Sequence, residues 1–194
     1  MLDGNGNTAY FGAGAVSFDG SVIVGEHAVG NKPDAFRWTA ATGVKRLPFG
    51  IAIAVTPDGT MVAGGDIWWD TSGQTGIFGP FPGEQDQTQA YGLSGTGQAP
   101  IAVGGAIKGS DDNGATIHTF RWTPSGGLTD LGVLVGDQSF ATAISADGTV
   151  IVGEHTDAAG FGGRIAGPPP PVWWTSARLV ARRRPQLRSI RTAR

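Results

Sequence analysis

The chain has 194 residues, of which 33 are glycine, 40% are hydrophobic and 15% are charged, and its formal net charge is -2. Glycine above its usual share of about 7%, together with a charged fraction below the usual value of about 25%, indicates one domain rich in turns and short strands. Cysteine is absent, which excludes disulfide frameworks and thiolate metal sites, and no uncharged apolar run reaches the ~18 residues of a membrane helix.

The charges are distributed unevenly. Seven of the 14 basic residues are arginines within residues 178–194, where there is no acidic residue, so the rest of the chain carries 7 basic and 16 acidic residues. This tail lacks interleaved aromatic residues, so we expect it to be disordered or artefactual, as in an out-of-frame translation, and not a nucleic-acid or lipid partner site. The first six residues lack the basic and apolar segments of a signal peptide. We also expect the chain to be a fragment of a longer protein.

One hairpin pattern recurs along the chain. Each copy has an alternating segment of small residues, a turn, a β-branched run and a closing glycine, which is typical of two paired strands. Three copies turn at Asp-Gly, which predicts a two-residue hairpin turn, and the third copy has Thr96-Gly97 instead. The four copies occupy residues 13–25, 52–64, 90–104 and 141–153.

Two further apolar segments follow each hairpin. The first is an aromatic strand at residues 35–39, 67–70, 119–123 and 172–175, and the second lies at residues 43–47, 76–78, 127–131 and 178–180. The turns at Asp19, Asp58, Thr96 and Asp147 are 39, 38 and 51 residues apart, a period typical of propellers and solenoids.

Four short strands per period predict an all-β, β-propeller-like array of about four blade units, each with four antiparallel strands. The tryptophans of the third strands should pack between blades rather than form an exposed sugar-binding platform. Insertions are expected as loops at residues 108–115 and 156–171, and the array is expected to be part of a larger propeller. The units are residues 8–50, 51–83, 84–134 and 135–177.

The repeated motifs resemble a known family. The order A-x-A-[VI]-S-x-D-G-[ST]-V-I-V-G, then [AT]-F-R-W-T, then G-G-L-x-D-L-G-x-L-x-G is similar to the extracellular repeat proteins of the HAF family over about residues 8–177. The nearest copies of its tripeptide are His118-Thr119-Phe120 and Asp34-Ala35-Phe36. The resemblance implies a secreted or cell-surface β-propeller-like module, often beside an autotransporter barrel or a sorting anchor, and it offers no catalytic residues. The second unit, with Trp69-Asp70, is also similar to a WD40 blade.

The expected function is a non-catalytic interaction or structural scaffold. An unknown protein or glycan partner would contact the variable loops at residues 65–66, 79–89, 106–116 and 154–171. One alternative is an intracellular WD40-like interaction platform. Another is a polysaccharide-acting propeller enzyme, which would need Glu26, Asp66 and Glu154 to converge on an axial channel. The glycines lie in hairpin turns, so no nucleotide cofactor is expected, and no membrane insertion is expected either.

Five acidic and histidine residues follow the closing glycines of three repeats. Residues at one register of successive blades lie at one height, so these side chains are weak candidates for a divalent metal site. The alternative, which we favour, is that they are exposed residues at strand ends, and we therefore expect no metal. Asp111-Asp112-Asn113-Gly114 lacks the spacing of a calcium loop and is expected to be a solvated turn. The weak metal candidates are Glu26, His27, Asp66, Glu154 and His155.

Overall fold

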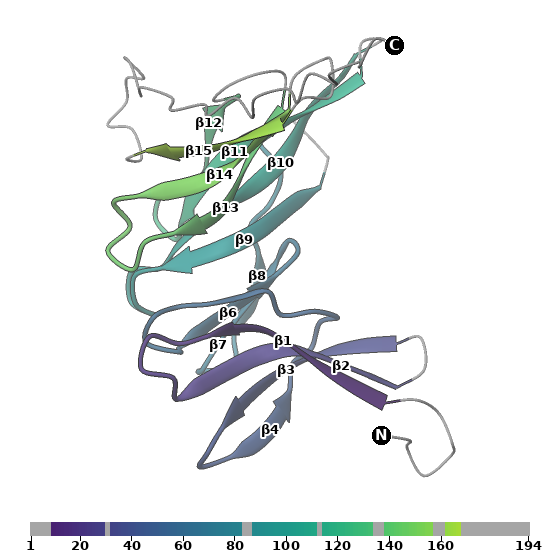
Figure 1. Cartoon of the computed structure of the whole chain (residues 1–194), viewed down its shortest axis with the longest axis vertical. Helices are drawn as coiled ribbons and strands as arrows, with labels where there is room; N and C mark the ends of the chain where they lie inside the picture. Colours follow the sequence, from purple (N-terminus) through teal and green to yellow (C-terminus); the bar gives the residue numbers. More distant parts are fainter. Residues whose placement is uncertain are drawn as a thin grey trace, which may run out of the picture.

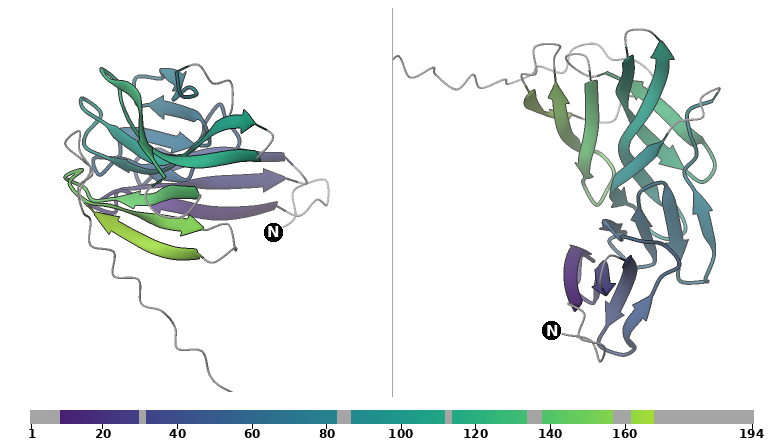
Figure 2. Two further views of the ribbon diagram at one scale, coloured as in Figure 1. Left: turned by 90° about the horizontal axis from the view of Figure 1, so that it is seen from above. Right: turned by 90° about the vertical axis from the view of Figure 1, so that its right-hand side faces the viewer.

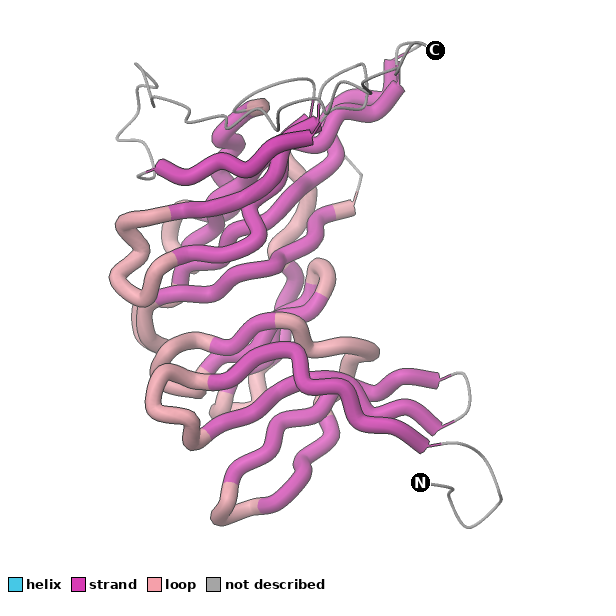
Figure 3. The backbone as a smooth tube through the Cα atoms, in the orientation of Figure 1, coloured by secondary structure: helices cyan, strands magenta, loops and turns pink. Residues whose placement is uncertain are grey.

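A computed structural model describes residues 9–29, 32–82, 87–111, 114–133, 138–156 and 162–167. Within these ranges the chain forms fifteen strands and no helix, which confirms the all-β prediction (Figure 3). It follows that the described residues contain no apolar helix of a length that could cross a membrane.

The strands form four small antiparallel sheets in chain order, which we call blades 1 to 4. Each strand pairs with its sequence neighbours, so every blade is a meander. Blade 1 contains β1 (Ala9–Val16), β2 (Val22–Val29), β3 (Lys32–Thr39) and β4 (Gly43–Arg46), and blade 2 contains β5 (Ala54–Val55), β6 (Met61–Gly64), β7 (Ile67–Asp70) and β8 (Thr75–Ile77). Blade 3 contains β9 (Thr88–Ser94), β10 (Ile101–Asp111), β11 (Gly114–Thr123) and β12 (Gly127–Gly132), and blade 4 contains β13 (Gln138–Ile144), β14 (Ile151–Thr156) and β15 (Gly162–Gly167).

The blades are arranged as a four-bladed propeller whose members follow one another along an arc (Figures 1 and 2). Blade 1 contacts blade 2 through β1 and β5, blade 2 contacts blade 3 through β9, and β13 of blade 4 lies against β9, β10 and β11. The first strand of blades 2, 3 and 4 therefore lies at the contact with the preceding blade. Blades 1 and 4 stand at the two ends of the arc (Figure 2, right).

Two segments that were predicted to be loops contain strands in the structure. Residues 108–111 and 114–115 extend the β10–β11 hairpin, in which Ile107 pairs with Ile117 and Asp111 with Gly114. The third strand of blade 4 is β15, which lies inside the predicted insertion at residues 156–171 and pairs with β14. In both places the backbone N–H and C=O groups of two strands adjacent in the sequence pair with each other, so their hydrogen bonds need no segment distant in the sequence. The predicted strand at residues 172–175, the segment at 178–180 and the arginine tail lie outside the described residues.

The Asp-Gly turns are longer than predicted. The Ser17 amide donates to the Val22 carbonyl and the Gly20 amide donates to the Ser17 carbonyl, which leaves residues 18–21 in the loop rather than a two-residue turn. The Ser17 hydroxyl donates to Asp19 and accepts from the Val22 amide, so side chains stabilise the wider loop. Gly20 has φ +74°, the left-handed conformation for which glycine is needed here.

The core lies between the blades rather than inside any one of them. One cluster joins blades 1 and 2 around Val24 and Val62, a second joins blades 2 and 3 around Met61 and Phe120, and a third joins blades 3 and 4 around Val103. Trp69 and Trp122 are buried in the first and second of these clusters, which confirms for these two residues the prediction that tryptophans pack between blades. Trp38 is partly exposed, and Trp173 and Trp174 lie outside the described residues.

Candidate functional site: a cleft between blades 3 and 4

A cleft of about 240 Å³ opens between blades 3 and 4. Its walls come from β9 and β10, from the start of β11 and from β13. Two of the four segments that were predicted to be variable loops, residues 79–89 and 106–116, contribute to it. The structure places Gln87 directly before β9, Gln89 on β9, and Ala106 and Ile107 on β10. The lining residues are Gln87, Gln89, Tyr91, Gly105, Ala106, Ile107, Ile117 and Phe140.

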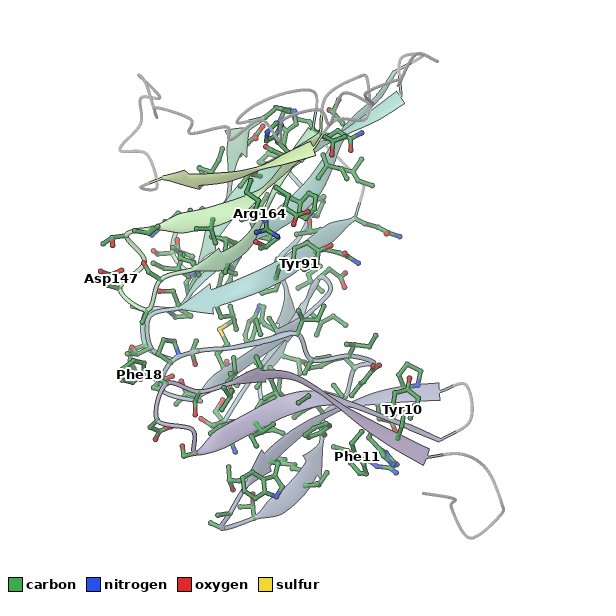
Figure 4. All side chains as sticks on the ribbon, in the orientation of Figure 1. Tyr10, Phe11, Phe18, Tyr91, Asp147 and Arg164 are labelled. Carbon is green, nitrogen blue, oxygen red and sulfur yellow. The ribbon has the colours of Figure 1, made fainter. Side chains whose placement is uncertain are left out.

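Two aromatic rings from different blades form its apolar part. The rings of Tyr91 on β9 and Phe140 on β13 have centroids 5.8 Å apart and are tilted by 48° (Figure 4 labels Tyr91). Gly105 allows this approach, since a Cβ at that position would lie 2.9 Å from the Cβ of Phe140 and 2.9 Å from Cγ2 of Ile117. A side chain at residue 105 would therefore push the two blades apart.

The polar part of the cleft is neutral. The Tyr91 hydroxyl donates a hydrogen bond to Oε1 of Gln89, and burial raises the pKa of Tyr91, so the phenol stays protonated at neutral pH. The other lining side chains are amides, aliphatic groups and a phenyl ring, and none of them exchanges protons near pH 7. The cleft can therefore stack against, enclose and hydrogen-bond a ligand, but it holds no acid–base pair.

The sequence analysis did not identify Tyr91 or Phe140. A signal was present for Tyr91, because the equivalent residue is Gly14 in the first repeat and Thr142 in the fourth. A large aromatic residue at a position that holds a small residue in these two repeats indicates that this position does something other than pack the strand. Phe140 precedes the fourth repeat and carries no comparable signal, since its role depends on contact with another blade.

The weak metal candidates stay on separate blades. Glu26 and His27 lie on β2 in blade 1, Glu154 and His155 lie on β14 in blade 4, and Asp66 lies between β6 and β7 in blade 2. The ring of His27 packs against Phe11 at a centroid distance of 4.4 Å. Among the described residues no three histidine or carboxylate side chains are close enough to hold a metal ion. The shared register does not bring the residues together, because blades 1 and 4 lie at opposite ends of the arc.

The acidic set needed for the polysaccharide-enzyme alternative is separated for the same reason. Glu26, Asp66 and Glu154 belong to blades 1, 2 and 4, respectively, and they do not form a group within the described structure. In the segment predicted to be a solvated turn, Asp111 is the last residue of β10 and pairs with Gly114, the first residue of β11, and residues 112–113 lie outside the described ranges.

The recurring aspartates have structural partners. The pKa of Asp19 is lowered to about 2, mainly by the Ser21 amide and the Ser17 hydroxyl, and the pKa of Asp147 is lowered to about 2, mainly by the Ser145 hydroxyl and the Thr149 amide. In blade 2, Asp58 also accepts a hydrogen bond from the Gly97 amide of blade 3 at 2.9 Å. These carboxylates therefore stabilise turns and, at Asp58, connect two blades.

His118, quoted for the family tripeptide, belongs to a polar cluster on blade 3. Its Nδ1 lies 3.0 Å from Oδ1 of Asp130, and the Lys108 ammonium lies 2.6 Å from Oδ2 of the same carboxylate. Burial raises the pKa of Asp130, but hydrogen bonds from Lys108, from the Gly132 amide and from His118 outweigh it, so the pKa is lowered. The cluster joins β10, β11 and β12, which gives His118 a role inside one blade.

No protein-family model matches the chain, and no curated protein sequence is significantly similar to it.

Proposed function

We propose that this chain is a non-catalytic interaction module that binds a protein partner in the cleft between blades 3 and 4. The observation that carries the proposal is the lining of the cleft, in which Tyr91 and Phe140 face each other beside the amides of Gln87 and Gln89. Aromatic and amide groups without a titratable pair favour binding over proton transfer. Variable loops on a repeated scaffold are also where repeat proteins place their binding surfaces.

The size of the cleft favours an inserted side chain over a free small molecule. Its volume of about 240 Å³ is below the range of about 300–1,000 Å³ that is usual for small-molecule pockets. An aromatic or branched apolar side chain would fit in the cleft, against the apolar wall that the Tyr91 and Phe140 rings form together. The two glutamines can donate to and accept from the backbone of the segment that carries it. The expected partner is thus a neutral, exposed protein segment with one apolar anchor.

We also propose that the module acts outside the cell or on the cell surface. The support is the similarity of its repeated motifs to the HAF repeats, described above. Antibody detection in culture medium and on intact source cells, compared with the lysed cells, tests this point. Protein found only after lysis would contradict it.

Peptide display tests the binding proposal directly. A random peptide library is selected on the immobilised full chain, and enriched peptides are measured by calorimetry against wild type, Tyr91→Ser and Gln89→Ala. We expect peptides with an apolar anchor, and at least tenfold weaker binding to Tyr91→Ser because the aromatic wall is lost. Gln89→Ala should weaken binding less.

Ile77→Ser is the matched control, since Ile77 is exposed on β8 of blade 2, away from the cleft. It should bind the peptides as wild type does. A selection that enriches no peptide, or peptides that bind the Tyr91→Ser variant with unchanged affinity, would contradict the proposal.

A further inference from the structure

The repeat gives each blade two different faces. We define the leading face as the side that packs on the preceding blade and the trailing face as the side that packs on the following blade. Because side chains alternate along a strand, β6 illustrates both: Val62 packs on blade 1, and its neighbours Met61 and Ala63 pack on blade 3. The same alternation holds in every blade, so equivalent residues can be compared along the arc.

Leading residues are buried in blades 2 and 3, and in blade 4 the equivalent Ile144 is partly buried against blade 3. In blade 2, Val55 is 7% exposed and Val62 is fully buried, and in blade 3, Leu93 is 7% exposed. In blade 1 the residue equivalent to Val55 and Leu93 is Val16, which is 57% exposed. The other leading residues of blade 1 are also less buried than their equivalents: Ala13 is exposed, and Ile23 and Trp38 are partly exposed.

Trailing faces show the same pattern at the other end of the arc. Val24 of blade 1, Ala63 of blade 2 and Val103 of blade 3 are all fully buried against the blade that follows. The equivalent residue of blade 4 is Val152, which is 37% exposed, and its neighbour on that face, Val150, is 43% exposed. The described structure thus exposes one leading face and one trailing face, and each of them carries exposed apolar residues.

We propose that the trailing face of blade 4 binds the leading face of blade 1 in a second copy of this chain. The proposed contact continues the interfaces inside the chain, because a trailing face meets a leading face at each of its three junctions. The two free faces present the equivalent residues of the same repeat. Val150 and Val152 of one copy would meet Ala13, Val16 and Ile23 of the other, as Val22 and Val24 meet Ala52, Val55 and Val62 within the chain.

This contact is head to tail, so the two surfaces that meet are different. Such contacts stop growing only when they close a ring. Two arcs of four blades would give eight blades, which is within the range of about 4–8 found in propellers. We therefore expect a closed pair of chains, in which no leading or trailing face is left exposed.

The mass of the full chain in solution tests the proposal. Light scattering after gel filtration is carried out over a range of concentrations on wild type, Val16→Asp and Val152→Asp, with circular dichroism to check that each is folded. Wild type should have twice the 19.9 kDa of one chain. Each aspartate variant should be a monomer, because it removes one of the two faces that every contact requires. Ile77→Asp, which changes a residue 63% exposed on blade 2, is the control and should behave as wild type.

Mixing the two monomeric variants gives the decisive measurement. Val16→Asp keeps an intact trailing face and Val152→Asp keeps an intact leading face, so an equimolar mixture restores one of the two junctions of the ring. It should form a species of twice the chain mass, at higher concentration than wild type needs, because the second junction brings the two introduced carboxylates together. A wild-type chain that stays monomeric at all concentrations overturns the proposal, whatever segment then covers the two faces. It is equally overturned if one variant alone still forms pairs, which would indicate contact between like faces, or if the mixture stays monomeric.

Discussion

The closing glycine of each hairpin is fixed by contact with a carbonyl on the adjacent strand. A Cβ at Gly104 would lie 1.9 Å from the Gln89 carbonyl oxygen, and the equivalent distance at Gly153 is 2.2 Å from the Phe140 carbonyl oxygen. The pairing register changes next to both glycines, which marks a β-bulge. At the bulge the backbones of the two paired strands come close together. The glycine that ends each repeat is thus a steric requirement of the bulged hairpin.

Gly104→Ala is therefore expected to lower the free energy of unfolding by about 1–3 kcal/mol, because the added methyl group forces β9 and β10 apart. Urea denaturation followed by tryptophan fluorescence measures the change. Gly50→Ala is the matched control, since its Cβ would lie 3.7 Å from the nearest atom, the Pro33 carbonyl oxygen. A loss at Gly50 as large as the loss at Gly104 would argue against the steric explanation.

The turn aspartates connect stability to pH. The pKa of Asp147 is lowered to about 2 in the folded chain, mainly by the Ser145 hydroxyl and the Thr149 amide. An aspartate in an unfolded chain has a pKa of about 3.9. Because the folded pKa is the lower one, the stabilisation is fully present above about pH 4 and is lost as the pH falls toward 2.

Asp147→Ala should therefore be less stable than wild type at pH 6, and the difference should shrink as the pH falls from about 4 to 2. Urea unfolding at a series of pH values checks this. Ser145→Ala, which removes the hydroxyl donor, should shift the carboxyl titration of Asp147 upward in a ¹³C NMR experiment. A titration midpoint for wild-type Asp147 near 4 would be inconsistent with these turn hydrogen bonds.

At the scale of the elements, each strand is stabilised mainly by the neighbouring blade. Trp122 on β11 is 8% exposed and packs edge-on against Phe78 of blade 2, with ring centroids 5.1 Å apart. Trp38 on β3 is its equivalent in blade 1, where the leading face is free, and it is only partly buried. Equivalent tryptophans in equivalent strands thus contribute different amounts to the free energy of unfolding, because a neighbouring blade covers one of them and not the other.

Trp122→Ala should lower the free energy of unfolding by about 3–5 kcal/mol, the usual cost of removing a large buried ring. Trp38→Ala should cost less than half as much in dilute solution, where the leading face of blade 1 is open. Chemical denaturation of both variants under one set of conditions makes the comparison. Equal losses would show that the blade itself, rather than the junction between blades, buries these rings.

At the scale of the whole molecule, the contacts between blades connect nearest neighbours along the arc. Blades 2 and 3 have a neighbour on each side, whereas blades 1 and 4 each have one within the described structure. In a repeat array the free energy of unfolding is close to a sum of one contribution from each repeat and one from each junction between neighbouring repeats. Opening an inner blade breaks two junctions, so it costs more free energy than opening an end blade. This arrangement predicts a gradient of stability along the chain.

Amide hydrogen exchange should show that gradient. We expect the amides of β6 and β10, in the inner blades, to exchange more slowly than those of β2 and β14, in the end blades. Mass spectrometry of peptides from dilute protein measures all four strands in one experiment. Uniform protection across the blades would instead show that the chain opens as one cooperative unit.

Much of the fold was predictable because pairing within a blade is local. The alternation in residues 141–144, the turn at Asp147 and the strand that follows all lie within one short stretch, and the stretch occurs four times. Because the pattern recurs, the third copy could be recognised although Thr96 replaces the aspartate. The length of the turn was missed because it depends on hydrogen bonds that Asp19 accepts from the Ser17 hydroxyl and the Ser21 amide, which spacing alone does not show.

The candidate cleft was only half predictable. Gln89 and Ile107 lie in stretches where the repeats vary, and such variation is visible in the sequence. Phe140 is 49 residues from Tyr91, and their contact exists only because blade 4 packs on blade 3.

By itself the sequence determined the all-β class and the repeated blade of short antiparallel strands, because these follow from alternation and turns between adjacent segments. Only the tertiary structure decided that the candidate metal residues stay apart, that residues 162–167 form the third strand of blade 4, and which two faces remain uncovered. Those outcomes depend on how the blades are placed relative to one another, and that placement is set by side chains that are distant in the chain and meet only when their apolar surfaces leave water.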